Sequence, residues 1–177
     1  RAASATWSAS RAGWATSVAT QERILVLDTF VPPVGIPGSV RPATLDDLDL
    51  GAAWIEQFAV DAGTFLPDPR ESFLSRLPGN RFWVVDGEPV SFAGHAPLVD
   101  AGGTVVARVG PVYTPAGHRR RGYGAAVTAA VTAELLVAAD IVMLFTDAAN
   151  PTSNGVYERL GFRVVGEVVD LDLAARL

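Results

Sequence analysis

The segment Arg108–Val127, RVGPVYTPAGHRRRGYGAAV, constrains the fold more than any other part of this chain. It runs from an apolar, strand-like stretch through a Pro/Gly break into the basic, glycine-bearing loop His118–Gly124, and then into small residues typical of a helix. Glycines in such a loop let the backbone approach a ligand, and the N–H groups that open the helix converge with the positive end of its dipole. The segment therefore predicts a phosphate-binding loop.

Two common phosphate-binding loops do not match this segment. A Walker A loop ends in Gly-Lys-Ser/Thr, and the chain contains no lysine. A dinucleotide-binding fingerprint needs a third glycine where Val127 stands. The remaining pattern, Arg119-x-x-Gly122-x-Gly124, resembles the pyrophosphate-binding loop of the GCN5-related N-acetyltransferase (GNAT) family. The alternative interpretation of the three adjacent arginines is an ordinary solvated loop.

A second motif lies between residues 140 and 162. An apolar strand, 141–146, precedes Asn150-Pro151, where proline suits the first position of a helix. A glycine then ends the helix before another strand. This order resembles the downstream motif of the same family, which is represented here by Asn150, Asn154, Tyr157, Gly161 and Phe162. The two resemblances together span residues 105–169.

Composition narrows the class of protein. A chain of 177 residues buries enough surface to form one domain without a metal or disulfide. The absence of cysteine excludes disulfides, a thiolate nucleophile and Cys-ligated zinc. A net charge of −5 argues against a nucleic-acid surface, and no apolar stretch is long enough to span a bilayer. We expect a cytoplasmic bacterial protein, a monomer or homodimer, with no nucleic-acid or membrane partner.

The first part of the chain is predicted to stand apart from the rest. Residues 1–20 are rich in Ala, Ser and Thr and read as a linker or a loosely docked segment, with Trp7 and Trp14 two helical turns apart. Residues 23–30 predict a strand, and the following prolines cannot continue it. We therefore expect residues 1–37 to be an N-terminal extension, for which the remnant of a preceding domain is one interpretation, and residues 38–177 to be the main domain.

The pattern of strands and helices in residues 38–177 predicts a mixed α/β (α+β) fold, in which a mostly antiparallel sheet is flanked by helices. This order of elements matches the fold of the GNAT family. The predicted strands are 39–42, 81–85, 89–97, 104–114, 140–146 and 162–170, with Asp86-Gly87 as a hairpin turn. The predicted helices are 44–61, 69–77, 122–139 and 151–160.

The resemblance to the GNAT family implies direct transfer of an acetyl group from acetyl-CoA to a primary amine of a small molecule or peptide. No covalent enzyme intermediate and no metal are implied. The backbone N–H of Val112 is the implied donor to the oxyanion. The residues implied to contact acetyl-CoA are Val112, Tyr113, Thr114, Arg119, Arg120, Arg121, Gly122, Tyr123, Gly124, Ala125, Asn150, Asn154 and Tyr157.

Tyr157 is the implied acid for the leaving thiolate, and its alternative role is packing under Phe162. The base is less defined, because residues 104–112 contain no carboxylate where some family members carry a glutamate. Glu56, His95 and Asp147 are the candidates for substrate contact and for the base. A CoA-binding regulatory module without turnover is the alternative function.

Overall fold

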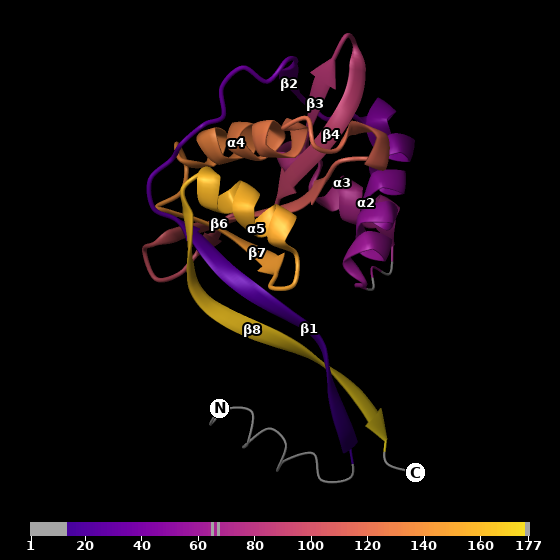
Figure 1. Ribbon diagram of the computed structural model, residues 1–177, viewed down its shortest axis with the longest axis vertical. Coiled ribbons are helices and arrows are strands. Elements are labelled where there is room, and N and C mark those ends of the chain that lie inside the picture. Colours follow the sequence, from indigo (N-terminus) through magenta and orange to yellow (C-terminus); the bar gives the residue numbers. More distant parts are fainter. Residues whose placement is uncertain (1–13, 65, 67, 176–177) are drawn as a thin grey trace.

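One mixed sheet with helices on both faces forms the protein (Figure 1). The computed structural model describes residues 14–64, 66 and 68–175. The sheet has eight strands in the order β2-β3-β4-β6-β7-β1-β8, and β5 pairs with β6 off this path. All paired strands are antiparallel except β6 and β7. The predicted fold class is confirmed.

The elements follow the predicted order. The strands are β1 (Trp14–Leu27), β2 (Ser39–Pro42), β3 (Arg81–Val85), β4 (Glu88–His95), β5 (Val99–Asp100), β6 (Val105–Tyr113), β7 (Ile141–Asp147) and β8 (Phe162–Ala175). The helices are α2 (Leu48–Ala62), α3 (Pro69–Ser75), α4 (Tyr123–Leu135) and α5 (Pro151–Arg159). Short 3-10 turns occupy Leu45–Asp47, Leu77–Gly79 and Ala116–His118.

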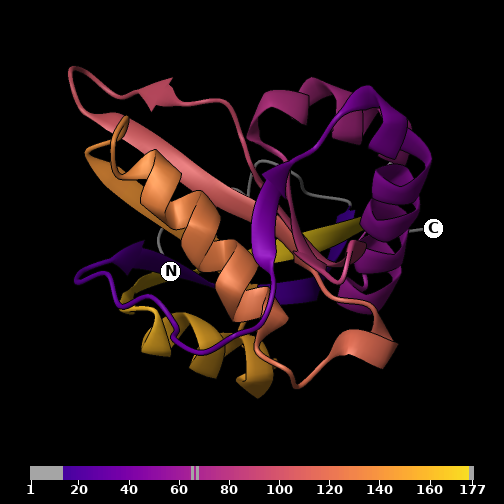
Figure 2. The same cartoon turned by 90° about the horizontal axis from the view of Figure 1, so that it is seen from above.

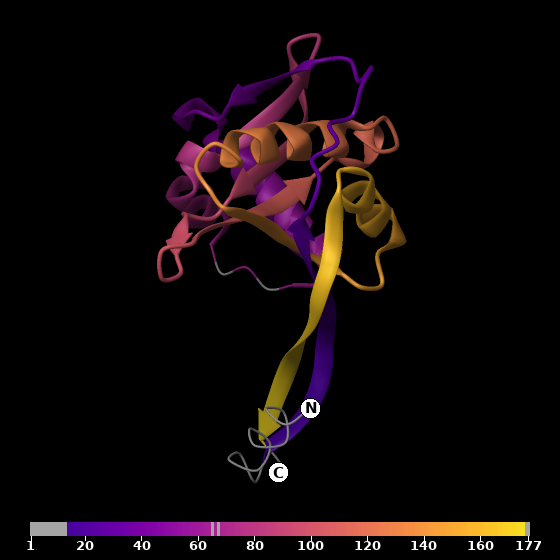
Figure 3. The ribbon, with the colours of Figure 1, turned by 90° about the vertical axis from the view of Figure 1, so that its left-hand side faces the viewer.

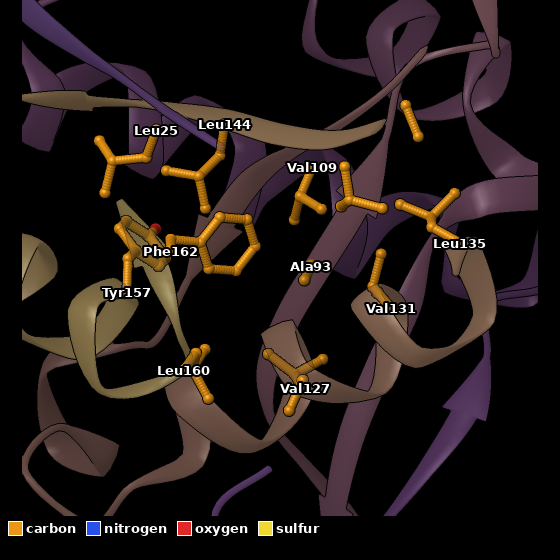
Figure 4. Close-up of a cluster of buried hydrophobic side chains, with 13 residues drawn as sticks. Leu25, Ala93, Val109, Val127, Val131, Leu135, Leu144, Tyr157, Leu160 and Phe162 are labelled. Atoms are coloured by element: carbon orange, nitrogen blue, oxygen red, sulfur yellow. The ribbon is translucent and has the colours of Figure 1, made fainter. Parts of the chain in front are cut away.

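The two helical layers pack on opposite faces of the sheet (Figure 2). One core lies between the sheet and the helices α4 and α5, with Val127, Leu144 and Tyr157 among its buried side chains (Figure 4). The other core lies under α2 and α3 and is largely aromatic, because Phe73, Phe82 and Phe92 are completely buried there. Alternate residues of each central strand therefore face different cores.

Strand β1 lies in the sheet, between β7 and β8 and antiparallel to both. The sequence predicts a strand only from Arg23 onward, with residues 14–20 in a linker. That expectation is wrong for residues 14–20, because they pair with residues 170–175 of β8. Both strands have 14 residues and extend beyond the rest of the sheet (Figure 3). Trp7 lies outside the described residues, and a domain boundary at residue 37 stays a prediction.

Two helices differ at their ends from the prediction. The first turn of the predicted helix 44–61 is a 3-10 turn, in which Asp47 accepts hydrogen bonds from the Thr44 N–H and the Arg41 guanidinium. The helix predicted over 122–139 ends at Leu135, because the chain then turns to enter β7 beside β6. There the Asp140 N–H donates to Val105 O and the Asp140 carboxylate accepts from Val105 N.

Residues 28–38 form a strap that leads from β1 to β2 and passes across the start of α4 (Figure 3). The Val31 N–H donates to Leu160 O, and the Trp83 indole donates to Pro37 O at 2.9 Å. The strap, Trp83 and α4 line an apolar cavity of about 430 Å³. None of the described helices is long and apolar enough to cross a membrane.

Candidate functional site

The two parallel strands at the centre of the sheet separate at their carboxyl ends. Pairing of β6 with β7 runs from Val106 and Ile141 to Val109 and Leu144. β6 then continues to Tyr113 and β7 to Asp147 without pairing to each other. The helices α4 and α5 follow these two strands, so both of their N-termini lie at this end of the sheet (Figure 1).

The start of α4 has no cap from the protein itself. Gly122 is the N-cap residue with φ 84°, in the left-handed region, and no described side chain accepts a hydrogen bond from this end of the helix. The first helical hydrogen bond runs from the Ala126 N–H to Gly122 O. The N–H groups of the first helical residues Tyr123, Gly124 and Ala125 are therefore left without a helical acceptor, at the positive end of the helix dipole.

The three arginines before α4 differ in their surroundings. Arg119 binds the Asp61 carboxylate at the end of α2 at 2.6 Å, and its Nε donates to Thr114 O at 2.9 Å. Arg120 and Arg121 are exposed and form no ion pair with any residue that the structure describes. The two residues that directly precede the uncapped helix start thus have no carboxylate partner in the part of the chain that the structure describes.

Gly122 also contacts the strap. A Cβ at Gly122 would lie 2.5 Å from Cδ1 of Ile36, whereas a Cβ at Gly124 would meet only the Thr114 hydroxyl at 3.2 Å. The need for glycine at position 122 therefore comes from its positive φ and from the packing of Ile36. Close approach of a phosphate to this glycine stays a prediction.

The start of α5 is closed by its own residues. The Asn150 side chain accepts a hydrogen bond from the Ser153 N–H, and Pro151 occupies the first turn. Asn154 is buried, and its side-chain N–H donates to the carbonyls of Asp147 and Ala148. The Asn154 Oδ1 atom, however, is buried without a hydrogen-bond partner. This atom is a preformed acceptor for an N–H group.

Tyr157 lies on α5, and its ring forms a T-shaped pair with the Phe162 ring, at 6.3 Å between ring centroids (Figure 4). Only 9% of the residue is exposed, and burial raises the pKa of its hydroxyl to about 12. The hydroxyl therefore stays protonated at neutral pH. Both roles considered for Tyr157, packing and proton donation, are compatible with this position.

The last residues of β6 point their backbone groups in two directions. The Ser91 hydroxyl on β4 donates to Tyr113 O at 3.0 Å, so the Tyr113 carbonyl faces β4. Successive residues of a strand turn their backbone groups to opposite sides. The N–H of Val112 accordingly faces the side of β7, where the two strands no longer pair. The Thr114 hydroxyl lies 2.8 Å from the Ser91 hydroxyl.

The three substrate-contact candidates from the sequence are not brought together. Glu56 is on the exposed side of α2. The His95 ring lies against Gly79, and its Nδ1 is 2.7 Å from Ala96 O. Asp147 alone lies at the open ends of β6 and β7, where its carboxylate accepts from the Ala149 N–H.

Sequence reasoning missed Glu22, which pairs with Asp147 across β1 and β7. Partial burial, followed by the nearby Asp170 and Asp147, raises the pKa of Glu22, while Arg108 lowers it. No local signal marks this residue, because its position depends on the insertion of β1 beside β7. Among the residues that the structure describes, no group of His, Cys, Asp or Glu side chains could hold a metal ion.

Comparison with known proteins extends these observations. Residues 104–169 match the model of the FR47-like protein family. No curated protein matches the sequence. A GCN5-related N-acetyltransferase from Kribbella flavida is similar at 24% identity and a TM-score of 0.63, over 94% of this chain and 62% of that one.

Two further solved structures have the same fold. A GCN5-related N-acetyltransferase from Sphaerobacter thermophilus gives a TM-score of 0.68 at 14% identity, over 99% of this chain and 57% of that one. A transcriptional regulator from Bacillus halodurans gives 0.61 at 18% identity, over 75% of this chain and 97% of that one. The chain thus spans about three fifths of the length of the two acetyltransferases. The chain therefore has the fold of these acetyltransferases, and the family-model match lies in the part that contains β6, α4, β7 and α5.

Proposed function

We propose that this protein is an acetyl-CoA-dependent N-acetyltransferase that moves the acetyl group directly to a primary amine of a small molecule or peptide. The observation that carries the proposal is the uncapped start of α4 beside the separated ends of β6 and β7. A helix start of this kind binds anions, and the open strand ends offer backbone groups to an extended ligand.

The described residues fit the two ends of acetyl-CoA. The N–H groups at the start of α4, with Arg120 and Arg121, would hold the pyrophosphate. The buried Asn154 Oδ1 would accept a hydrogen bond from an amide N–H of the pantetheine arm, which gives this orphaned atom its partner. The Asn150 Oδ1 already accepts a hydrogen bond from α5, so Asn150 would contribute less than Asn154 to the binding of acetyl-CoA.

Two groups would act on the reacting thioester. The N–H of Val112 faces the separated strands and would stabilise the oxyanion that forms when the amine attacks the carbonyl carbon. Tyr157 would donate its proton to the departing thiolate. Its raised pKa keeps the proton in place until negative charge develops on the sulfur.

Glu22 is the carboxylate that best fits the base. It lies opposite Asp147 at the open end of β7, and its raised pKa moves it toward the pH at which a base works efficiently. It would accept a proton from the substrate ammonium before attack, and Asp147 would hold the positive charge nearby. This role needs no carboxylate on β6.

Incubation with acetyl-CoA and a panel of primary amines, while free thiol is followed, tests the proposal. We expect thiol release that depends on the amine, with mass spectrometry detecting the acetylated product. Calorimetry with acetyl-CoA serves as the second measurement. Tight binding without product from any amine would favour the alternative, a CoA-binding regulatory module, and no binding would exclude both.

A further inference from the structure

Arg76 and Arg108 bring two positive charges together on the α2 and α3 side of the sheet. Arg108 lies between two residues of β6 that face the α4 core, so its own side chain points to the opposite face. Arg76 follows α3 and reaches the same strand, where its Nη1 lies 3.4 Å from Gly110 O. Gly110 is the first residue of β6 beyond the pairing with β7.

These two arginines lack the partners that other arginines of this protein have. The guanidinium of Arg108 lies over the Phe145 ring, at 5.6 Å from its centroid, and the only described acceptor for Arg76 is the long contact to Gly110 O. Neither forms an ion pair within the described residues. The arginines that do have a carboxylate partner are Arg41, Arg70, Arg81, Arg119 and Arg163.

Of the two arginines, Arg76 is in the less favourable surroundings, because Arg108 also interacts with Glu22, whose pKa it lowers. Burial, and in addition the charge of Arg108, lower the pKa of Arg76. Removing a guanidinium from water and placing it near a like charge costs free energy unless an anion compensates. Because Arg108 stacks on Phe145 with the face of its guanidinium, the N–H groups at the guanidinium edge are available to donate hydrogen bonds to a carboxylate or phosphate.

We propose that Arg76 and Arg108 bind an anionic group, a carboxylate or a phosphate, on the amine that accepts the acetyl group. This inference rests on the proposed function and names the substrate class. The carboxylates of Asp147 and Glu22 lie on the same face of the sheet as Arg108, Asp147 on the neighbouring strand β7 and Glu22 one strand further, on β1. The acceptor would therefore be a zwitterion, with its ammonium toward these carboxylates and its anion toward the arginines.

Matched amines test the proposal. The intact protein is assayed with acetyl-CoA and α-amino acids, their carboxamides, aminoalkyl phosphates and the corresponding amino alcohols. We expect kcat/KM to be at least about 10-fold higher for one anionic series than for its neutral counterpart. The preferred series shows whether the anionic group of the acceptor is a carboxylate or a phosphate.

Three variants distinguish a specific effect of Arg76 and Arg108 from a general effect of the protein's charge. Arg108→Gln should lower kcat/KM for the anionic amine by about 10- to 100-fold. The neutral amine should show only the smaller change that follows from the pKa of Glu22, which Arg108 lowers. Arg76→Gln should do the same, and the exposed Arg108 keeps the test valid if Arg76→Gln does not fold. Arg70→Gln removes a charge from α3 where Asp49 already pairs with it, so it is the matched control and should have no effect.

Calorimetry of the same ligands in the presence of CoA distinguishes this inference from the proposed function. Acetylation of neutral and anionic amines at equal rates, unaffected by Arg108→Gln, would overturn the inference and keep the function. Arg108-dependent binding of the anionic amines without acetylation would keep the anion site and remove the function. If no anion-bearing amine is bound or acetylated, the inference is wrong.

Discussion

The helices α4 and α5 follow the two parallel strands β6 and β7, but only α5 has a side chain that caps its N-terminus. At α5 the Asn150 side chain accepts a hydrogen bond from the Ser153 N–H, and Pro151 removes another free donor. At α4 no described side chain caps the helix, and Gly122 takes a left-handed conformation instead. The chain supplies its own partner for one helix end and leaves the other available to an anion.

The two helices also carry different side chains into the site. The helix α5 places Asn154 and Tyr157 in the interior near the open strand ends, whereas the buried positions of α4 are mostly small and apolar. We infer that α4 contributes mainly backbone N–H groups to binding and that α5 contributes the side chain for chemistry. Four predictions test this division.

The largest effect is expected for Tyr157→Phe. The change keeps the ring beside Phe162 and removes only the hydroxyl, so a positioned acid would lose about 10²- to 10⁴-fold in kcat, or roughly 3–5 kcal/mol of barrier. The Kd for acetyl-CoA should hardly change. Single-turnover measurement of acetyl transfer checks this. An unchanged rate would mean that Tyr157 only packs and that α5 contributes no acid.

Gly122→Ala should lower the free energy of unfolding by about 2–4 kcal/mol, because alanine resists positive φ and its Cβ would press on Ile36. Denaturant unfolding measures the loss. The double variant with Ile36→Ala should show a coupling of about 1–3 kcal/mol, since the second change removes the clash. Full stability with loss of acetyl-CoA binding would instead mean that the ligand, and not the strap, requires glycine here.

Arg121→Ala should weaken acetyl-CoA binding by about 1–3 kcal/mol, and Arg120→Ala by a similar amount, because neither has a carboxylate partner in the described residues. Arg119→Ala is the matched control. Its guanidinium is already bound to Asp61 and Thr114 O, so we expect a smaller loss. Calorimetry at several salt concentrations compares them, and equal losses for all three would contradict the distinction.

Asn150→Ala should give the smallest effect and should act on stability. Loss of the cap costs about 1 kcal/mol, measured by denaturant unfolding, with little change in acetyl-CoA affinity. The comparison variant Asn154→Ala should weaken acetyl-CoA binding, because the Oδ1 atom has no partner within the described structure. If Asn150→Ala weakens binding more than Asn154→Ala, the assignment of the two asparagines must be reversed.

Much of the fold could be predicted because its signals are local. Asp86-Gly87 adopts positive φ at both positions and joins β3 to β4 as expected. Asn150-Pro151 opens α5, and Gly161 ends it with φ 95°. The loop that leads into α4 also ends where its glycines predict, because α4 begins at Tyr123 after Gly122. Each of these features depends on residues only a few positions apart.

The parts that the sequence did not predict depend on residues far apart in the chain. The strand propensity of β1 does not identify β7 and β8 as its partners. The position of Glu22 opposite Asp147 therefore could not be predicted from the sequence. The same limit applies to Arg119 with Asp61, 58 positions apart, and to Ile36 on Gly122. Hydrophobic burial and strand pairing across the whole sheet select these contacts.

The sequence by itself therefore determined the order of most elements and the resemblance to the GNAT family, and it predicts that the loop before α4 binds a phosphate. Turn conformations, helix caps and strand alternation depend on neighbouring residues, so a single sequence carries them. Only the tertiary structure decided which arginines have carboxylate partners and which, such as Arg76 and Arg108, have none among the described residues. The physical reason is that charge pairing depends on distances across the sheet, which are fixed only when distant strands and helices pack together.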